Sequence, residues 1–284
     1  METTYKNVFL YAMVDDYLQL RKSYSGKTSN FDAFGHPTKL SDSEIIYVYV
    51  VACLDYGANY AKTMRKCYEN GDIKVQLHKS QYSRRLQKLQ TMIDELLALL
   101  VSLFALQNLT YSVDTCPIPV CHNIRIPRCH LVKGEAYRGY CASKRVYYFG
   151  FKLHALTASN GAIIAFDFTP ASYSDQDTLH LLSFDIPEKS ELFADAIYCD
   201  YQQEERIKED LQINFQPQRK ANSKKEDNTY IHNRYVQINR KHIETVFSQM
   251  LSLFPRKVHA TNSAGFLLKM VGFIFAYNFN LFTA

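Results

Sequence analysis

Three carboxylates in the sequence occur in segments where an acid is unexpected. Asp114 lies within a run of β-branched and aromatic residues, Asp195 directly follows Glu-Leu-Phe-Ala at the end of a predicted strand, and Glu244 lies beside the apolar stripe of a helical pattern. A charge in such a setting is expected to line a site. Because crowded carboxylates raise one another's pKa, a cluster of them stays ionised only around metal ions or cationic side chains.

Such a cluster of acids has a well-defined chemistry. Mg²⁺ prefers oxygen ligands and retains several waters. Two such ions about 3.5–4 Å apart activate a water on one side of a phosphodiester and stabilise the leaving oxygen on the other. The three acids therefore predict phosphodiester chemistry with two Mg²⁺ or Mn²⁺ ions per active site, held by Asp114, Asp195 and Glu244.

A mixed sheet is expected to bring these acids together. Strand-like runs span 109–121, 146–159 and 162–172, with Asn160-Gly161 in a hairpin position. Helix and strand patterns then alternate as a helix at 175–184, a strand at 190–199, a helix at 201–211, a strand at 213–220 and a long helix at 233–254. The order is βββαβαβα. In such a sheet of five strands the first and fourth are neighbours, and the long helix packs across them.

The first hundred residues have helical periodicity instead. Ser41 and Glu44 have the spacing of a capping box, and one long helix is expected over 80–106. We therefore predict a helical, helix-turn-helix-like DNA-binding domain over 1–107 and an α/β catalytic domain over 108–284. A last apolar helix, 263–282, is expected to pack under the sheet.

Each acid also has an ordinary structural interpretation. Asp114 can end a strand before Pro117, Asp195 competes with Asp200 as the second acid, and Glu244 can pair with Arg240 one helical turn before it. Asp175 and Asp177 are expected to cap the following helix. Asp175 could also support the metal site.

Basic residues concentrate in three places that suit DNA phosphates, which are 84–85, 117–152 and 219–225. The segment 117–152 has seven Lys and Arg against one acid, interleaved with tyrosines that could stack on splayed bases. A solvated surface is the alternative for each cluster. The predicted DNA contacts are Arg84, Arg85, Arg125, Arg128, Lys144, Arg145, Lys152, Arg219, Lys220, Lys224, Lys225 and Arg240.

Composition excludes several other classes of protein. The 284 residues are 47% apolar and 21% charged, with few Gly and Pro, which excludes disordered and collagen-like chains. The acidic, interrupted N-terminal stretch lacks signal-peptide features, so a cytoplasmic, nucleoid-associated location with reduced thiols is expected. Cys116, Cys121, His122, Cys129 and His130 lack the usual zinc-site spacing, and buried or surface thiols are expected instead.

Four segments resemble, in order, the DDE transposases of bacterial insertion sequences, most closely the insertion-sequence-982 family. They are SVDTCPIPVC, YFGFKLHALTASNGAIIAFDFTPASYSD, FADAIY and RKHIETVFSQM, and the resemblance covers about 108–280. It implies a ribonuclease-H-like domain with Asp114, Asp195 and Glu244 as the metal-binding triad. Related families often carry a Tyr and a Lys where this chain has Gln237 and Leu251.

The resemblance also implies an activity and partners. The enzyme would cleave double-stranded DNA at the terminal inverted repeats of its element and join the 3′-OH to target DNA. Cutting two ends needs two active sites, so a homodimer on DNA is expected. No association with a membrane is expected. A non-mobile nuclease of the same fold and a DNA-binding regulator without catalysis are the alternatives.

Overall fold

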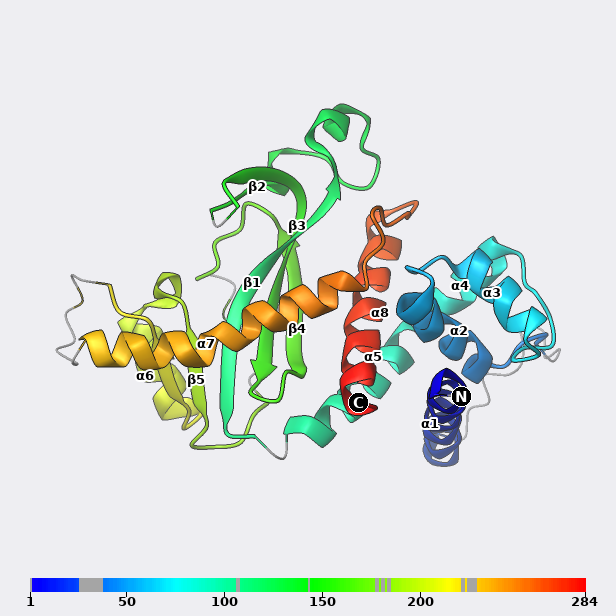
Figure 1. Cartoon of the computed structure of the whole chain (residues 1–284), viewed down its shortest axis with the longest axis horizontal. Coiled ribbons are helices and arrows are strands. Elements are labelled where there is room, and N and C mark those ends of the chain that lie inside the picture. The colour runs from blue at the N-terminus through cyan, green and yellow to red at the C-terminus, as the bar shows by residue number, and fades with distance from the viewer. Residues whose placement is uncertain are drawn as a thin grey trace. The chain divides into compact units, whose positions relative to one another are not determined.

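The chain forms two compact units, each described here by itself. The computed structural model describes residues 2–25, 38–105, 108–142, 144–176, 179, 182, 185–220, 223 and 229–284. The helical unit comprises 1–99, 252–260 and 264–284, and the sheet unit comprises 100–251 and 261–263 (Figure 1). The boundary expected at residue 107 and most of the helix expected at 175–184, including Asp177, lie outside the described residues.

The helical unit contains α1 (Glu2–Ser25), α2 (Asp42–Asp55), α3 (Tyr60–Glu69), α4 (Lys79–Lys88), the first part of α5 (Gln90–Ala105) and α8 (Ser263–Phe282). The capping box that begins α2 is confirmed: Ser41 and Glu44 each accept the other's backbone N–H. The single helix expected over 80–106 is instead two helices, because α4 ends at Lys88 and α5 begins at Gln90, with Leu89 between them.

The last helix, which the sequence predicted to pack under the sheet, packs within the helical unit. α8 belongs to the helical unit, where the Tyr49 hydroxyl donates to the Leu268 carbonyl at 2.6 Å and Phe273 stacks on Phe254 at 4.4 Å. Within the described part of the chain, α8 is the one helix long and apolar enough to cross a membrane, and 67% of its most apolar window is buried. A core helix of a folded unit has these same features.

The sheet unit is built on six strands rather than five. They are β1 (Thr110–Cys121), β2 (Arg138–Cys141), β3 (Val146–Ala158), β4 (Ile163–Pro170), β5 (Glu191–Ala194) and β6 (Asn214–Pro217). The order is β2-β3-β1-β5-β6. β2 pairs with the first part of β3, 146–149, and β4 pairs with its later part, 151–157. β1 runs parallel to β5 and antiparallel to β3, so the predicted neighbourhood of the first and fourth strands is confirmed. The short strand β2 was not predicted.

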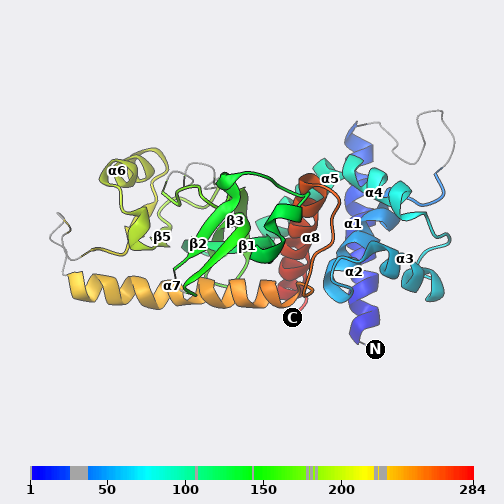
Figure 2. The ribbon, with the colours of Figure 1, turned by 90° about the horizontal axis from the view of Figure 1, so that it is seen from above.

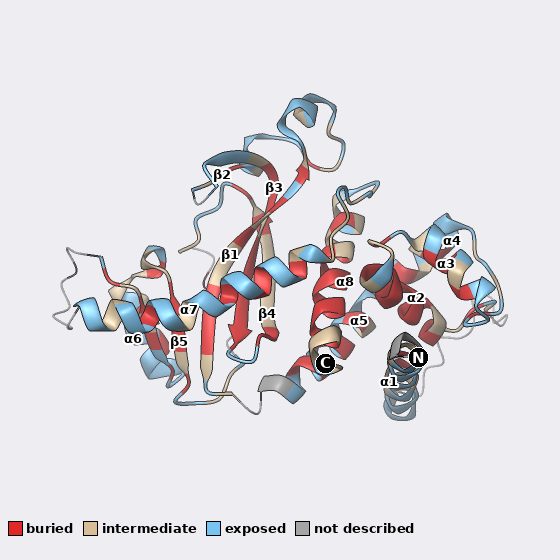
Figure 3. Cartoon of the chain, viewed as in Figure 1, coloured by how far each residue is buried: buried red, intermediate tan, exposed pale blue. Residues whose placement is uncertain are grey.

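Alternation along the strands gives the sheet two different faces. One face carries Tyr111 and Val113 of β1 and Leu192 and Ala194 of β5, which form a buried core with Ile207 of α6 (Tyr201–Asp210). Burial is strongest in the central strands and weakest in β2 and the segment before it (Figure 3).

The long helix α7 (Thr229–Ser252) crosses the other face (Figure 2). The Ser112 hydroxyl donates to the Asn239 carbonyl at 3.3 Å, and the Tyr235 ring packs edge-on against Phe193 at 5.3 Å. These contacts tie α7 to both β1 and β5, as predicted. The mixed α/β architecture fits a ribonuclease-H-like domain preceded by helices.

Candidate active site at the β1, β5 and α7 junction

Asp114 lies in the middle of β1, on the face that α7 crosses. It is paired across the sheet with Ala155, and strand alternation places it on the same side as Ser112, which contacts α7. Its Oδ1 accepts the backbone N–H of Thr115 at 2.8 Å. This hydrogen bond holds one carboxylate oxygen and leaves Oδ2 for a partner from the helix.

Asp195 is the first residue after β5, the parallel neighbour of β1. It caps the short 3₁₀ turn Ala196–Tyr198, since its Oδ1 accepts the Ala196 N–H at 2.6 Å. Asp200, the competing candidate, instead caps α6 through the N–H groups of Gln202 and Gln203. Asp195 also faces Arg240 of α7 at 3.4 Å.

Arg240 joins these two aspartates. Its Nη2 lies 3.0 Å from Asp114 Oδ2 and its Nη1 lies 3.4 Å from Asp195 Oδ1, so one guanidinium faces both carboxylates. The Arg240 side chain is 15% exposed, against 22% for Asp114 and 46% for Asp195. Sequence reasoning assigned Arg240 to DNA phosphates or to Glu244, but its charge is directed into the acidic pair.

The electrostatics of Asp114 reflect this arrangement. Burial raises the pKa of the Asp114 carboxyl, and the nearby charge of Asp195 adds to the rise. Arg240 and the Thr115 N–H oppose it. A cation beside Asp114, here Arg240, thus favours the ionised form of this carboxyl.

Glu244 lies one helical turn after Arg240 on α7 and is exposed. Within the described ranges, no three His, Cys, Asp or Glu side chains gather closely enough to hold a metal ion. The three predicted acids therefore do not form one cluster, and neither do Cys116, Cys121, His122, Cys129 and His130. The structure therefore brings together two of the three predicted acids.

The donor set of this pair fits a hard divalent cation. Asp114 supplies carboxylate oxygens from β1 and Asp195 from the end of β5, and they already converge on the positive charge of Arg240. Oxygen ligands on rigid elements are those that Mg²⁺ takes in proteins, with water completing the shell.

Asp175 belongs to a separate polar cluster on the opposite face of β1. It pairs with Lys152 at 2.6 Å and lies 3.4 Å from the Thr115 hydroxyl. Lys152 Nζ also donates to the Tyr173 carbonyl at 2.8 Å. Lys152, predicted to contact DNA, is thus engaged within the fold.

Tyr198, missed as a site residue, lies near enough to both groups of acids to be affected by their charges. It is buried, and burial together with the charges of Asp175 and Asp114 raises its pKa well above 10. The phenol therefore stays protonated beside the acids. The spacing Asp-x-x-Tyr after β5 was the signal in the sequence.

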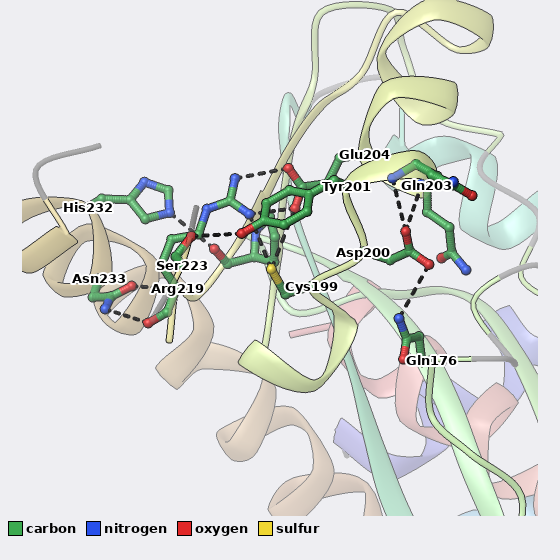
Figure 4. A network of polar contacts seen from close by, with 12 residues as sticks. Gln176, Cys199, Asp200, Tyr201, Gln203, Glu204, Arg219, Ser223, His232 and Asn233 are labelled. Carbon is green, nitrogen blue, oxygen red and sulfur yellow. Dashed lines mark hydrogen bonds and ion pairs between the residues drawn. The ribbon is translucent and has the colours of Figure 1, made fainter. Parts of the chain in front are cut away.

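The polar network in Figure 4 corrects the prediction for Arg219. This residue forms a two-point ion pair with Glu204 of α6, Nη1–Oε1 at 2.5 Å and Nη2–Oε2 at 2.9 Å, and both side chains are 4% exposed. Asn233 of α7 accepts the Arg219 N–H at 2.7 Å and donates to its carbonyl at 2.9 Å. Arg219 therefore fixes α6 and the start of α7 to the strand β6 and is too buried to contact DNA.

Arg85 is also a structural residue rather than a free cation. Its guanidinium donates to the Leu40 carbonyl at 2.6 Å and to Asp42 at 2.5 Å, which links α4 to the start of α2. The predicted DNA contacts that are exposed are Arg84, Arg125, Arg128, Lys144, Arg145 and Lys220. Lys224 and Lys225 lie outside the described residues.

Comparison with known proteins gives one finding. A family model described as a transposase DDE domain matches residues 105–260, which is more than half of the chain and includes all three predicted acids. No curated protein and no solved structure matches the chain.

Proposed function

Because the chain belongs to the transposase DDE domain family, we propose that it cleaves DNA at the ends of its own insertion sequence and joins the freed 3′-OH to target DNA. The observation that carries this proposal is the convergence of Asp114 and Asp195, from neighbouring parallel strands, on one cationic group. We also propose that the chain belongs to the insertion-sequence-982 family, which its sequence resembles most closely.

Asp114 and Asp195 would hold Mg²⁺ or Mn²⁺. When bound, two such ions lower the pKa of a water or 3′-OH nucleophile and stabilise the leaving oxygen of the phosphodiester. The chain's own contribution is orientation: the N–H groups of Thr115 and Ala196 fix one oxygen of each carboxylate. Arg240 faces both carboxylates and opposes the repulsion between them.

We propose Glu244 as the third acid. It follows Arg240 by four residues on α7, so it lies about 6 Å further along the helix axis, on the same side. Its exposure leaves the carboxylate free to turn toward a bound ion.

The proposed partners are double-stranded DNA and a second copy of the chain on that DNA. Exposed Arg84 on α4 is a candidate to read the element end, while the exposed cations of segment 117–152 are candidates for phosphate contacts. The proposed setting is the nucleoid of a prokaryotic cytoplasm.

The decisive experiment incubates the full chain with a labelled element-end duplex, a supercoiled target and Mg²⁺. Joined products support the proposal. Cleavage without joining would indicate a non-mobile nuclease, and a mobility shift without cutting would indicate a regulator, so either result overturns the transposase mechanism. Asp114→Asn serves as the inactive control.

A further inference from the structure

Residues 117–152 concentrate the positive charge of the whole chain. They hold seven of its 33 Lys and Arg and one of its 28 Asp and Glu, a net charge of +6, whereas the full chain carries +5. The rest of the chain is thus slightly acidic. We call residues 122–142 and 144–148 of this segment, most of which are exposed, the basic arm.

The structure sorts the tyrosines of the basic arm into two groups. Tyr137 packs edge-on against Phe151 with ring centroids 5.4 Å apart, and Tyr148 is partly buried. Tyr140 and Tyr147 are instead 52% and 71% exposed. They lie directly opposite each other across β2 and β3, with ring centroids 4.8 Å apart.

The backbone beneath this tyrosine pair is closely fitted. Gly139, beside Tyr140, has no room for a side chain, because a Cβ there would lie 2.8 Å from the Ala171 Cβ and from the Tyr148 ring. Gly150 adopts a positive φ of 159°, and its Cβ would lie 2.3 Å from the Ile118 carbonyl oxygen. The two glycines therefore let β2 and β3 approach their neighbours and hold the pair in place.

Exposed cations lie on the segments next to the pair. Lys144 and Arg145 occupy the turn between β2 and β3. Asn123 Nδ2 donates to the Tyr147 carbonyl at 2.8 Å, which anchors beside the pair the 3₁₀ turn that carries Arg125 and Arg128. Arg138 pairs with Glu135 at 2.8 Å, and among the described residues of the arm it is the one cation with an acidic partner.

Two exposed aromatic rings within a cluster of cations fit nucleic acid better than a protein surface. Base–aromatic stacking tolerates any base, while Lys and Arg neutralise the adjoining phosphates. The buried centre of a protein–protein interface is depleted of charge, which this arm is not.

We propose that Tyr140 and Tyr147 form a stacking site for a DNA base that has left the duplex stack. This inference rests on the proposed function, because it names how the same DNA is held. Tyr147 precedes Ala155, the sheet partner of Asp114, by eight residues, which is at most about 26 Å along the strand. The stacked base therefore lies within about eight base pairs of the bond that is cut.

The test measures affinity of the full chain, in chelator, for element-end duplexes that are fully paired or carry one mismatched pair at successive positions. Wild type is expected to bind a mismatch within about eight base pairs of the cleavage point about 5- to 100-fold more tightly than the paired duplex. Tyr140→Ala/Tyr147→Ala should lose this preference and keep its affinity for the paired duplex. Tyr140→Phe/Tyr147→Phe should keep the preference, since phenyl rings also stack.

Tyr24→Ala is the matched control, because Tyr24 is exposed on α1 in the other unit. The inference is overturned if wild type shows no preference, if the alanine variant retains it, or if the alanine variant changes only the oligomeric state. DNA cleavage and joining without a mismatch preference would overturn this inference alone. Absence of any DNA binding would overturn the proposed function as well.

Discussion

The guanidinium of Arg219 donates two hydrogen bonds to the carboxylate of Glu204, with N–O distances of 2.5 and 2.9 Å, and both side chains are almost closed to solvent. Burial alone would lower the pKa of Arg219, but the hydrogen bonds to Glu204 and Cys199 raise it overall. The pair links α6 to the end of β6, and Asn233 links the same residue to α7.

Glu204→Ala is expected to lower the free energy of unfolding by about 3–5 kcal/mol, because it leaves the Arg219 charge buried and unpaired. Urea denaturation of the purified chain measures this. Lys220→Ala, at the exposed neighbouring residue, should change the stability by less than about 0.5 kcal/mol. A loss below about 1 kcal/mol for Glu204→Ala would show that Arg219 does not depend on this partner.

Arg240→Gln is expected to lower the melting temperature in chelator and to increase the stabilisation given by Mg²⁺. Without the guanidinium, Asp114 and Asp195 face each other with no cation between them, so a divalent ion relieves more repulsion than in the wild type. Thermal unfolding with and without 10 mM Mg²⁺ would detect the difference. Arg234→Gln, exposed on the same helix, is the control. An equal Mg²⁺ shift in all three proteins would contradict the shared site.

Asp114→Asn, Asp195→Asn and Glu244→Gln should each reduce DNA cleavage at least about 100-fold while DNA affinity is largely retained. Each change removes an anionic metal ligand without altering the shape of the side chain. Glu209→Gln, exposed on α6, should cleave normally. Mg²⁺ and Mn²⁺ should support turnover, whereas Ca²⁺ should support binding with little turnover because its coordination is looser and larger. Near-normal cleavage by one variant would remove that residue from the site.

Stability is expected to fall as the pH is lowered from 7 to 5, in part through His154. This residue is buried on β3, with Nε2 2.8 Å from the Thr169 hydroxyl, and burial lowers its pKa to about 4 from 6.5. Between these values the unfolded chain binds a proton that the folded chain does not, so acid favours unfolding. The contribution is about 2 kcal/mol between pH 7 and pH 5.

His154→Gln should flatten this pH dependence, because glutamine keeps a hydrogen-bonding side chain but does not titrate. Urea denaturation at pH 7 and pH 5 for both proteins gives the comparison. If the two proteins lose equal stability between these pH values, His154 is not the titrating group.

Gly272→Ala is expected to destabilise the helical unit by about 1–3 kcal/mol, although alanine favours helices more than glycine. A Cβ on Gly272 of α8 would lie 2.6 Å from Cys53 Sγ and 2.8 Å from the Tyr49 ring, both on α2. Chemical denaturation measures the loss. The double variant with Cys53→Ala should recover part of it, since the nearest atom is removed. A stabilised single variant would show that α2 and α8 can separate without cost.

Local patterns determined much of the secondary structure from the sequence alone. The capping box of Ser41 and Glu44, the Asn-Gly turn between β3 and β4, and the apolar stripe of α7 are encoded within a few residues, so they could be predicted. The adjacency of β1 and β5 followed from the element order, because parallel strands with helical crossovers have few topologies. These features also placed Asp114 and Asp195 at neighbouring strands.

The partners of charged residues were decided only by the tertiary structure. Arg219, Arg85, Lys152 and Arg240 have the same appearance in the sequence as Arg125 or Lys144, yet the fold directs the first four into carboxylates and leaves the other two exposed. The last helix could not be assigned either, since a helix that is apolar on all sides does not specify which surface it packs against. Local spacing fixes periodicity, whereas an ion pair between residues 126 positions apart, such as Asp114 and Arg240, exists only once the chain has folded.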